Sequence, residues 1–186
     1  KIQPRQKLWV SECEGLTCTI PLEWTVQQCC GVTGEGILDG FQWMIDILSV
    51  ERSMPPVRKM VREIAETGAI PVIIGGDHTS AVGFHAGLAS VYGGLGIIWI
   101  DTHPDLNTLE TSPSGHIHGM PLATLLKRGS DSMLNAGKEC KTRDNQVAMI
   151  GTRDIDAGEL TWLNEGNINC MTMDFVRRNG LKSAME

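Results

Sequence analysis

The stretch Leu95-Gly96-Ile97-Ile98-Trp99-Ile100-Asp101-Thr102-His103-Pro104-Asp105 decides the fold expected of this chain. Its beginning, up to Ile100, is an apolar run rich in branched and aromatic side chains, which predicts a buried strand. A carboxylate, an imidazole and a second carboxylate follow at alternate positions: Asp101, His103 and Asp105. If this segment stays extended, the three side chains point the same way. Polar groups at the carboxyl end of a parallel strand lie where α/β sheets bind their ligands.

Strand and helix patterns alternate on both sides of this stretch. We expect helices over residues 54–67, 79–91, 121–127, 157–164 and 172–186, and strands over residues 70–74, 95–100, 146–150 and 167–171. Pro55 and Pro56 suit the first turn of the first helix, Gly68 suits its end, and Thr172 suits the N-cap of the last helix. The alternation predicts an α/β fold with a mainly parallel sheet covered by helices.

Three other segments carry weaker signals. Residues 7–10 and 17–20 are candidate short strands, and residues 41–50 fit either a helix or a strand. Residues 108–119 are polar and turn-rich, which predicts a loop.

The composition is that of a soluble globular protein of one domain. The chain has 186 residues, 41% of them hydrophobic, and a net charge of −6. Lysine and arginine are scattered, so we expect no nucleic-acid partner and no anionic membrane surface. We find no run of about 20 apolar residues and no signal peptide. The six cysteines form no CxxC pair, so we expect free thiols and a cytoplasmic location.

All five histidines lie between positions 78 and 118. A single histidine of this kind is more often packed and hydrogen-bonded than a ligand, but here several donors are grouped. His78 follows one expected strand, and Asp101, His103 and Asp105 follow another; adjacent parallel strands lie about 4.8 Å apart. Mixed imidazole and carboxylate ligands suit Mn²⁺, Fe²⁺ or Zn²⁺, and two such ions about 3.5–4 Å apart activate water. The group therefore predicts a metal site.

Two residues beside this group have other expected roles. His85 lies two turns into the helix that follows His78, and we interpret it as structural. Asp77 is either an acceptor for the ring of His78 or a cap of its own loop.

Longer motifs resemble those of the ureohydrolases, and most closely those of bacterial arginases. Gly75-Gly76-Asp77-His78-Thr79 matches the family's GGDH(S/T) element, and Asp101-Thr102-His103-Pro104-Asp105 matches its DAHxD element. Residues 107–121 are similar to the arginase substrate loop, and residues 151–159 to the later loop that holds the substrate's amino group.

The resemblance implies a three-layer α/β/α fold and two Mn²⁺ ions per active site in a complete chain. The implied ligands are His78, Asp101, His103 and Asp105, with Asp101 bridging. A metal-bound hydroxide would attack the guanidinium carbon of L-arginine, giving ornithine and urea. The implied catalytic residues are Asp105 and His118, with His118 as proton shuttle to the leaving amine, a role that suits its ordinary pKa of about 6.5.

The same resemblance implies the substrate contacts and the assembly. Asn107, Ser114 and His116 match positions that bind the substrate carboxylate, although His116 stands where the family has an asparagine. Asp156 and Glu159 match positions that bind the α-amino group. Arginases that the chain resembles form trimers or hexamers, so we expect a homo-oligomer.

The resemblance runs from about Met54 to Glu186 and leaves residues 1–53 as a poorly matched N-terminal part. The family's second acidic element, DxDGxDP, has no counterpart before Glu186, so residues 1–186 are interpreted as one ureohydrolase domain that is incomplete at its C-terminal end. Two alternatives stay open. One is a non-catalytic ureohydrolase-like subunit, favoured by the missing element and by the changes at Thr102, Pro104 and His116. The other is an agmatinase or another guanidino hydrolase.

Overall fold

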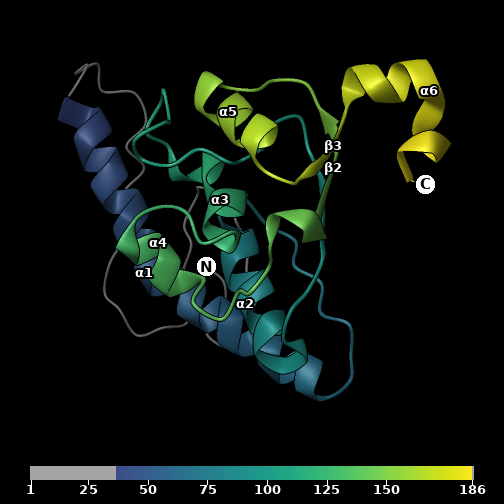
Figure 1. Cartoon of the computed structure of the whole chain (residues 1–186). Helices are drawn as coiled ribbons and strands as arrows, with labels where there is room; N and C mark the ends of the chain where they lie inside the picture. The colour runs from purple at the N-terminus through teal and green to yellow at the C-terminus, as the bar shows by residue number, and fades with distance from the viewer. Residues whose placement is uncertain (1–36, 186) are drawn as a thin grey trace, which may run out of the picture.

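The computed structural model of the chain describes residues 37–185 (Figure 1). The candidate strands over residues 7–10 and 17–20 and the first four cysteines lie outside the described residues, as does much of the N-terminal part over residues 1–53.

A parallel sheet forms the middle of the described chain. Its strands are β1 (Ile97–Ile100), β2 (Val147–Thr152) and β3 (Asn169–Thr172), in the order β1-β2-β3. Ile97 pairs with Val147, and both neighbouring pairs of strands run parallel. The three strands lie where the sequence predicts them, within about two residues at each end, and the parallel arrangement is confirmed.

Helices pack against one face of this sheet. These are α2 (Ser80–Tyr92), α3 (Pro121–Leu125) and α5 (Ala157–Glu165). The core between them and the sheet contains Ala86, Trp99, Leu106, Leu122, Leu125, Val147 and Met149. On the other face of β1, Ile98 and Ile100 are 71% and 75% exposed, as their alternation with the buried Trp99 requires. The α/β class is confirmed, and among residues 37–185 the helical layer that buries β1 lies on one side.

The first described helix, α1 (Ile37–Glu66), is longer than the sequence predicts. Pro55 and Pro56 lie inside it and not in its first turn, so the expected start at residue 54 is wrong, and residues 41–50 are helical. The buried residues Val50, Met54, Val61 and Ala65 continue one face through the proline pair. Packing of this face on α2 stabilises helical geometry where proline removes hydrogen bonds. As expected, the helix ends before Gly68, which has a φ of +80°.

Residues 70–74 do not form the expected strand. Ile70, Val72 and Ile74 are 88%, 77% and 87% exposed. A strand exists only through hydrogen bonds to a neighbour, and no neighbour among residues 37–185 pairs with this segment. The segment nevertheless delivers His78 to the start of α2.

The last part of the chain is helical with one break. Helix α6 (Met173–Met185) bends at Gly180, whose φ is +84°. The Thr172 hydroxyl accepts the N–H of Phe175 at 3.3 Å, which confirms its expected N-cap role. The sequence gives no signal for α4 (Asp131–Ala136) or for the 3₁₀ turns Ile117–Gly119 and Asp144–Gln146. None of the helices in the described part of the chain combines the length and the hydropathy needed to cross a bilayer.

Candidate metal and substrate site

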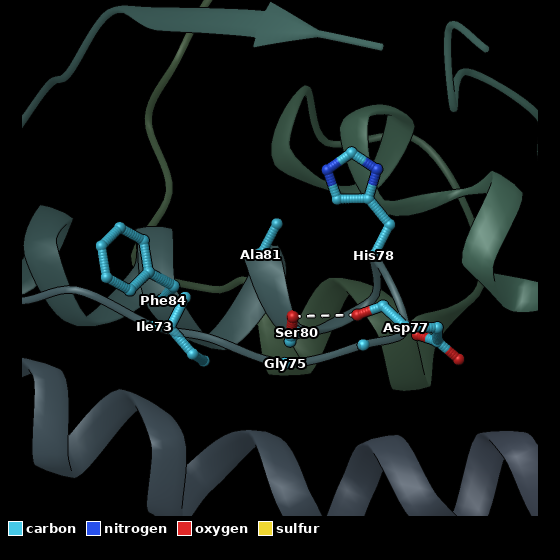
Figure 2. Close-up of a pocket in the computed structure, with 8 residues that line it drawn as sticks. Ile73, Gly75, Asp77, His78, Ser80, Ala81 and Phe84 are labelled. Carbon is cyan, nitrogen blue, oxygen red and sulfur yellow. Dashed lines mark hydrogen bonds between the residues drawn. The ribbon is translucent and has the colours of Figure 1, made fainter. Parts of the chain in front are cut away.

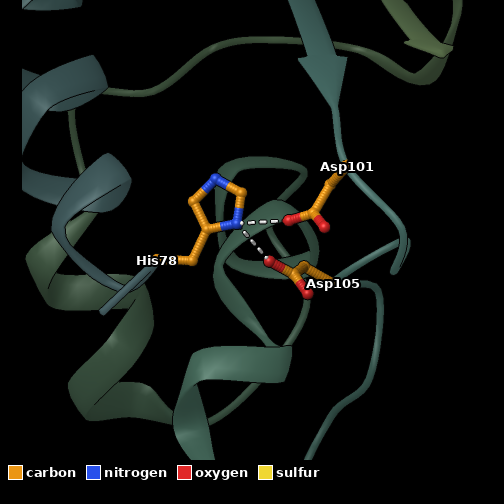
Figure 3. A group of neighbouring side chains, drawn as sticks. All are labelled: His78, Asp101 and Asp105. Atoms are coloured by element: carbon orange, nitrogen blue, oxygen red, sulfur yellow. Dashed lines mark ion pairs between the residues drawn. The ribbon is translucent and has the colours of Figure 1, made fainter. Parts of the chain in front are cut away.

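Loops from different parts of the chain meet beyond the carboxyl end of β1. His78 comes from the turn before α2, and Asp101 and Asp105 come from the loop that leaves β1 (Figure 3). The loop that leaves β2 joins them, because the N–H groups of Arg153 and Asp154 both donate to the carbonyl of Thr102, at 2.9 and 3.2 Å.

Three side chains converge in this region. Nδ1 of His78 lies 2.9 Å from Oδ2 of Asp101 and 2.8 Å from Oδ2 of Asp105. One ligand atom from each residue lies within 4.8 Å of the other two (Figure 3). Asp105 is buried, and its Oδ2 faces the ring nitrogen of His78, which it shares with Asp101. An imidazole and two carboxylates with free lone pairs can hold a divalent cation.

The ionisation of this group reflects its burial and its pairing. Burial raises the pKa of Asp105, while the hydrogen bond and the charge of His78 oppose the rise. The hydrogen bond to Asp105 raises the pKa of His78, and the two carboxylates add to this against the effect of burial. Two carboxyl groups around one imidazole give this group an excess of acidic side chains, which favours a cation.

Packing and capping fix the direction of His78. Its ring stacks on Trp99 of β1 with centroids 4.1 Å apart and planes at 16°. Asp77 caps the turn: its carboxylate accepts the N–H of Thr79 at 2.9 Å, and its carbonyl accepts the hydroxyl of Ser80 at 2.9 Å (Figure 2). Of the two roles considered for Asp77, the structure therefore shows the loop cap. A shallow pocket beside this turn is lined partly by Ile73, Ala81 and Phe84.

His103 lies outside the converging group. Its Nδ1 is 3.9 Å from Oδ1 of Asp101, and its Nε2 is 3.3 Å from Oδ2 of Asp154. The condition that residues 101–105 stay extended is not met, because Asp105 has a φ of +53° and the loop bends. The side chains at alternate positions therefore do not all point the same way. Asp105 turns toward His78, and His103 remains at the surface.

Three of the expected substrate residues form one hydrogen-bonded unit. Asn107 Nδ2 donates to Asp156 Oδ2 at 2.7 Å. Thr111 donates to the amide oxygen of Asn107 at 3.0 Å. Glu159 is only 3% exposed, and it accepts the backbone N–H of Leu106 at 3.0 Å and that of Asp156 at 2.9 Å. Burial raises the pKa of Glu159, and these two bonds act in the opposite direction.

The remaining expected residues lie on the exposed loop before α3. The N–H of His116 donates to the hydroxyl of Ser114 at 3.3 Å. The rings of His116 and His118 stack with centroids 5.3 Å apart. All three side chains are exposed, and no contact among the described residues joins them to His78, Asp101 or Asp105.

His85 is structural, as expected. Its Nδ1 lies 3.2 Å from the thiol of Cys140 and its Nε2 lies 3.1 Å from the hydroxyl of Thr142. Burial lowers the pKa of His85 to about 4. Cys140 and Cys170, the cysteines within the described part of the chain, are free thiols, in agreement with the sequence.

Asp154 and Trp99 contribute to the site although the sequence analysis assigns them no role in it. Asp154 is adjacent in sequence to residues expected to bind substrate, but its partner His103 is distant in sequence. The stacking of Trp99 on His78 depends on the face of β1 that Trp99 occupies and on the position of the turn before α2. In the sequence, the only indication of this contact is that an aromatic residue stands just before the metal loop.

Comparison with known proteins shows which family this chain resembles in sequence and structure. The model of the arginase family matches residues 10–186. An arginase of Bacillus subtilis is 44% identical over 127 residues, which are 68% of this chain and 43% of that protein. Its solved structure superposes with a TM-score of 0.72 at 40% identity, covering 75% of this chain and 49% of that one. The structure of Entamoeba histolytica arginase in complex with L-ornithine has a TM-score of 0.68 at 30% identity and covers 75% of this chain and 48% of the other.

These relatives are longer than the chain described here. The matched region spans 43% of the Bacillus subtilis protein and 42% of a Bacillus caldovelox arginase. The chain therefore spans less than half the length of the curated relatives that it matches.

Proposed function

This chain belongs to the arginase family, and from that premise we propose that the protein hydrolyses L-arginine to ornithine and urea with two Mn²⁺ ions. The observation that carries the proposal is the convergence of His78, Asp101 and Asp105 within 4.8 Å beyond the end of β1. The relatives support it because their shared name is arginase. The E. histolytica structure holds L-ornithine, which is the amino-acid product that the proposal requires.

The donor set fits manganese. Imidazole and carboxylate ligands without thiolates suit Mn²⁺, and the buried Oδ2 of Asp105 shares the ring nitrogen of His78 with Asp101. We propose that His78, Asp101 and Asp105 would hold the metal. His103 is proposed as a further ligand, since its Nδ1 faces Asp101 at 3.9 Å. When bound, Mn²⁺ supplies positive charge that lowers the pKa of water and makes hydroxide available near neutral pH.

The protein's own residues then orient water and move the proton. Asp105 is proposed to accept a hydrogen bond from the attacking water, because its carboxylate is buried beside His78. His118 is proposed to give a proton to the leaving amine, and an imidazole suits this task because its ordinary pKa is about 6.5. Its stacking on His116 supports the ring within an exposed loop.

The substrate contacts follow from charge. Asn107, Ser114 and His116 offer amide, hydroxyl and imidazole donors for the carboxylate of arginine, and Asp156 offers a carboxylate for its ammonium group. Asn107 and Asp156 are joined at 2.7 Å, so both ends of the amino-acid head group would meet one connected unit. Glu159 is proposed to act behind Asp156, through its backbone. As partners we propose only the small-molecule substrate and further copies of this chain.

Urea release from L-arginine by the full-length protein with added Mn²⁺ tests the proposal, with agmatine as the competing substrate. We expect urea from arginine and none from agmatine, together with two manganese ions per protomer. Release of urea from agmatine alone would favour the agmatinase alternative. Absence of both urea and bound manganese would favour the non-catalytic subunit.

A further inference from the structure

We propose that Glu159 is a positioning residue that locks the metal-binding loop and the substrate-binding loop in one fixed relation, by accepting one backbone N–H group from each. This inference rests on the proposed function, because it assigns an indirect role within the same site. It differs from a direct contact between Glu159 and the substrate.

The burial and the bonding of Glu159 carry the inference. The residue is 3% exposed. Oε1 accepts the N–H of Leu106 at 3.0 Å, and Oε2 accepts the N–H of Asp156 at 2.9 Å. The first bond joins α5 to a loop that is 53 residues away in the sequence. Both oxygens therefore face the protein backbone, and the chain itself covers the carboxylate.

Each bonded N–H group belongs to a segment that carries site residues. Leu106 follows Asp105 directly, and Asp105 has the left-handed φ of +53° that turns its carboxylate toward His78. The Leu106 N–H is the first hydrogen-bond donor after that turn, so its acceptor helps to hold the turn. Asp156 holds Asn107 at 2.7 Å. A single side chain therefore connects a metal ligand to the pair expected to bind the amino-acid head group.

The chemistry requires a carboxylate at this position. Two N–H donors need two acceptor oxygens, which an ionised carboxylate provides. A glutamine of the same shape has one oxygen and presents an NH₂ group to the second donor, so one bond is lost. The repulsion between the two N–H groups also displaces the side chain and weakens the remaining bond. Glu159→Gln should therefore loosen both loops without changing the volume of the side chain.

The test is the Glu159→Gln variant of the purified protein, measured in three ways. The first is the Kd for Mn²⁺, from the electron paramagnetic resonance signal of free Mn²⁺. The second is the KM for L-arginine, and the third is hydrogen–deuterium exchange at residues 106 and 156. We expect Mn²⁺ affinity to fall about 10-fold or more, as for other residues that orient metal ligands. KM should rise in parallel, and exchange at both amides should accelerate.

Two variants control for loss of the fold. Thr142→Val removes a buried hydroxyl that bonds His85 and the carbonyl of Leu95, away from both loops. It should lower Tm while leaving the Kd for Mn²⁺ within about twofold of the wild type. If Glu159→Gln does not fold, Glu159→Asp keeps the charge but is one methylene shorter, so it should weaken Mn²⁺ binding in the same direction.

The possible outcomes separate the explanations. A higher KM with unchanged Mn²⁺ affinity and unchanged amide exchange would indicate direct substrate contact and would overturn the inference. Equal loss of Mn²⁺ affinity in Thr142→Val at a similar Tm would overturn it as well. If the wild type bound no Mn²⁺ and released no urea, the proposed function would fail, whereas faster exchange at both amides in Glu159→Gln would still establish the link between the loops.

Discussion

The ring of His78 places one nitrogen between two carboxylate oxygens (Figure 3). This nitrogen carries at most one proton, and one proton makes one good hydrogen bond. Asp101 and Asp105 together therefore keep negative charge that no described side chain balances. Two carboxylate oxygens that compete for one proton in a partly buried place are costly, and a bound cation would remove that cost. These three side chains are therefore unfavourable as a packed cluster without an ion, and favourable as ligands of a cation.

His85 gives a pH-dependent prediction at the residue scale. Its pKa is lowered from 6.5 to about 4 because burial disfavours the charged ring. The neighbouring thiol of Cys140 has a pKa raised to about 12, so it stays neutral. In the unfolded chain the histidine titrates near its ordinary value, so between pH 6.5 and 4 the unfolded state binds the additional proton. The contribution of neutral His85 is complete above about pH 6.5 and falls as the pH approaches 4.

Integrated between pH 4 and 6.5, the contribution of neutral His85 to the free energy of unfolding is on the order of 3 kcal/mol. The measurement is urea-induced unfolding of the wild type and His85→Gln at pH 7, 6 and 5, with EDTA present. We expect the stability advantage of the wild type to shrink as the pH falls, because glutamine does not titrate. A difference between the two proteins that stays constant with pH would contradict this account. Contributions from the metal-site carboxylates cancel in the comparison.

The types of residue in the sequence predicted which side chains lie together, but alternation did not predict the directions in which they point. The presence of His78, Asp101 and Asp105 after expected strands indicated a shared site, and the structure brings these three together. The direction of His103 was not predictable, because it depends on the left-handed turn at Asp105. Contacts that are distant in the sequence hold that turn, including the bond from the Leu106 N–H to Glu159.

At the scale of elements, the close approach of α1 and α2 positions the turn that carries His78. A Cβ atom on Gly83 would lie 3.1 Å from Cβ of Val57, and one on Gly87 would lie 2.7 Å from the carbonyl oxygen of Arg58. The two helices therefore meet where α2 has no side chains. Because α2 begins directly after the turn, a displacement of this helix would also displace His78.

The substitution Gly87→Ala tests this packing. Alanine favours the helix by up to about 1 kcal/mol, but its methyl group would collide with the backbone of α1, which cannot move cheaply. We expect a net loss of about 1–3 kcal/mol in the free energy of unfolding, as for other overpacked sites. Gly94→Ala is the matched control, since an added Cβ there meets nothing within 4 Å. Equal stability of the two variants in thermal unfolding would show that the helices can separate without cost.

The elements that the sequence predicted correctly are those whose pattern is local. Strands β1, β2 and β3 and helices α2 and α5 follow from apolar runs and periodicity. Two expectations failed because they depend on distant partners. Pro55 and Pro56 stand within a helix, since packing on α2 maintains it, and residues 70–74 are apolar like a strand but have no described strand to pair with.

At the scale of the whole molecule, the candidate site lies beyond the carboxyl end of β1, at the edge of the helix-covered core. Its proposed ligands come from two loops that are anchored separately. The α2 turn is held by α1, and the β1 exit loop is held by the β2 loop through Thr102. A cation bound between them would join the α2 turn and the β1 exit loop directly. Metal binding should therefore stabilise the molecule as a whole.

Thermal unfolding with and without Mn²⁺ tests this link. At a free concentration about 100 times the Kd, a ligand bound only by the folded state stabilises it by about 2.7 kcal/mol, which corresponds to a rise of about 5–10 °C in Tm. Asp101→Asn should abolish most of this rise and keep the fold, because an asparagine oxygen can still accept the N–H of His103 as Asp101 does. Glu165→Gln, an equal charge change on an exposed residue at the end of α5, should keep the full rise. A shift of equal size in all three proteins would mean that Mn²⁺ acts elsewhere than between His78, Asp101 and Asp105.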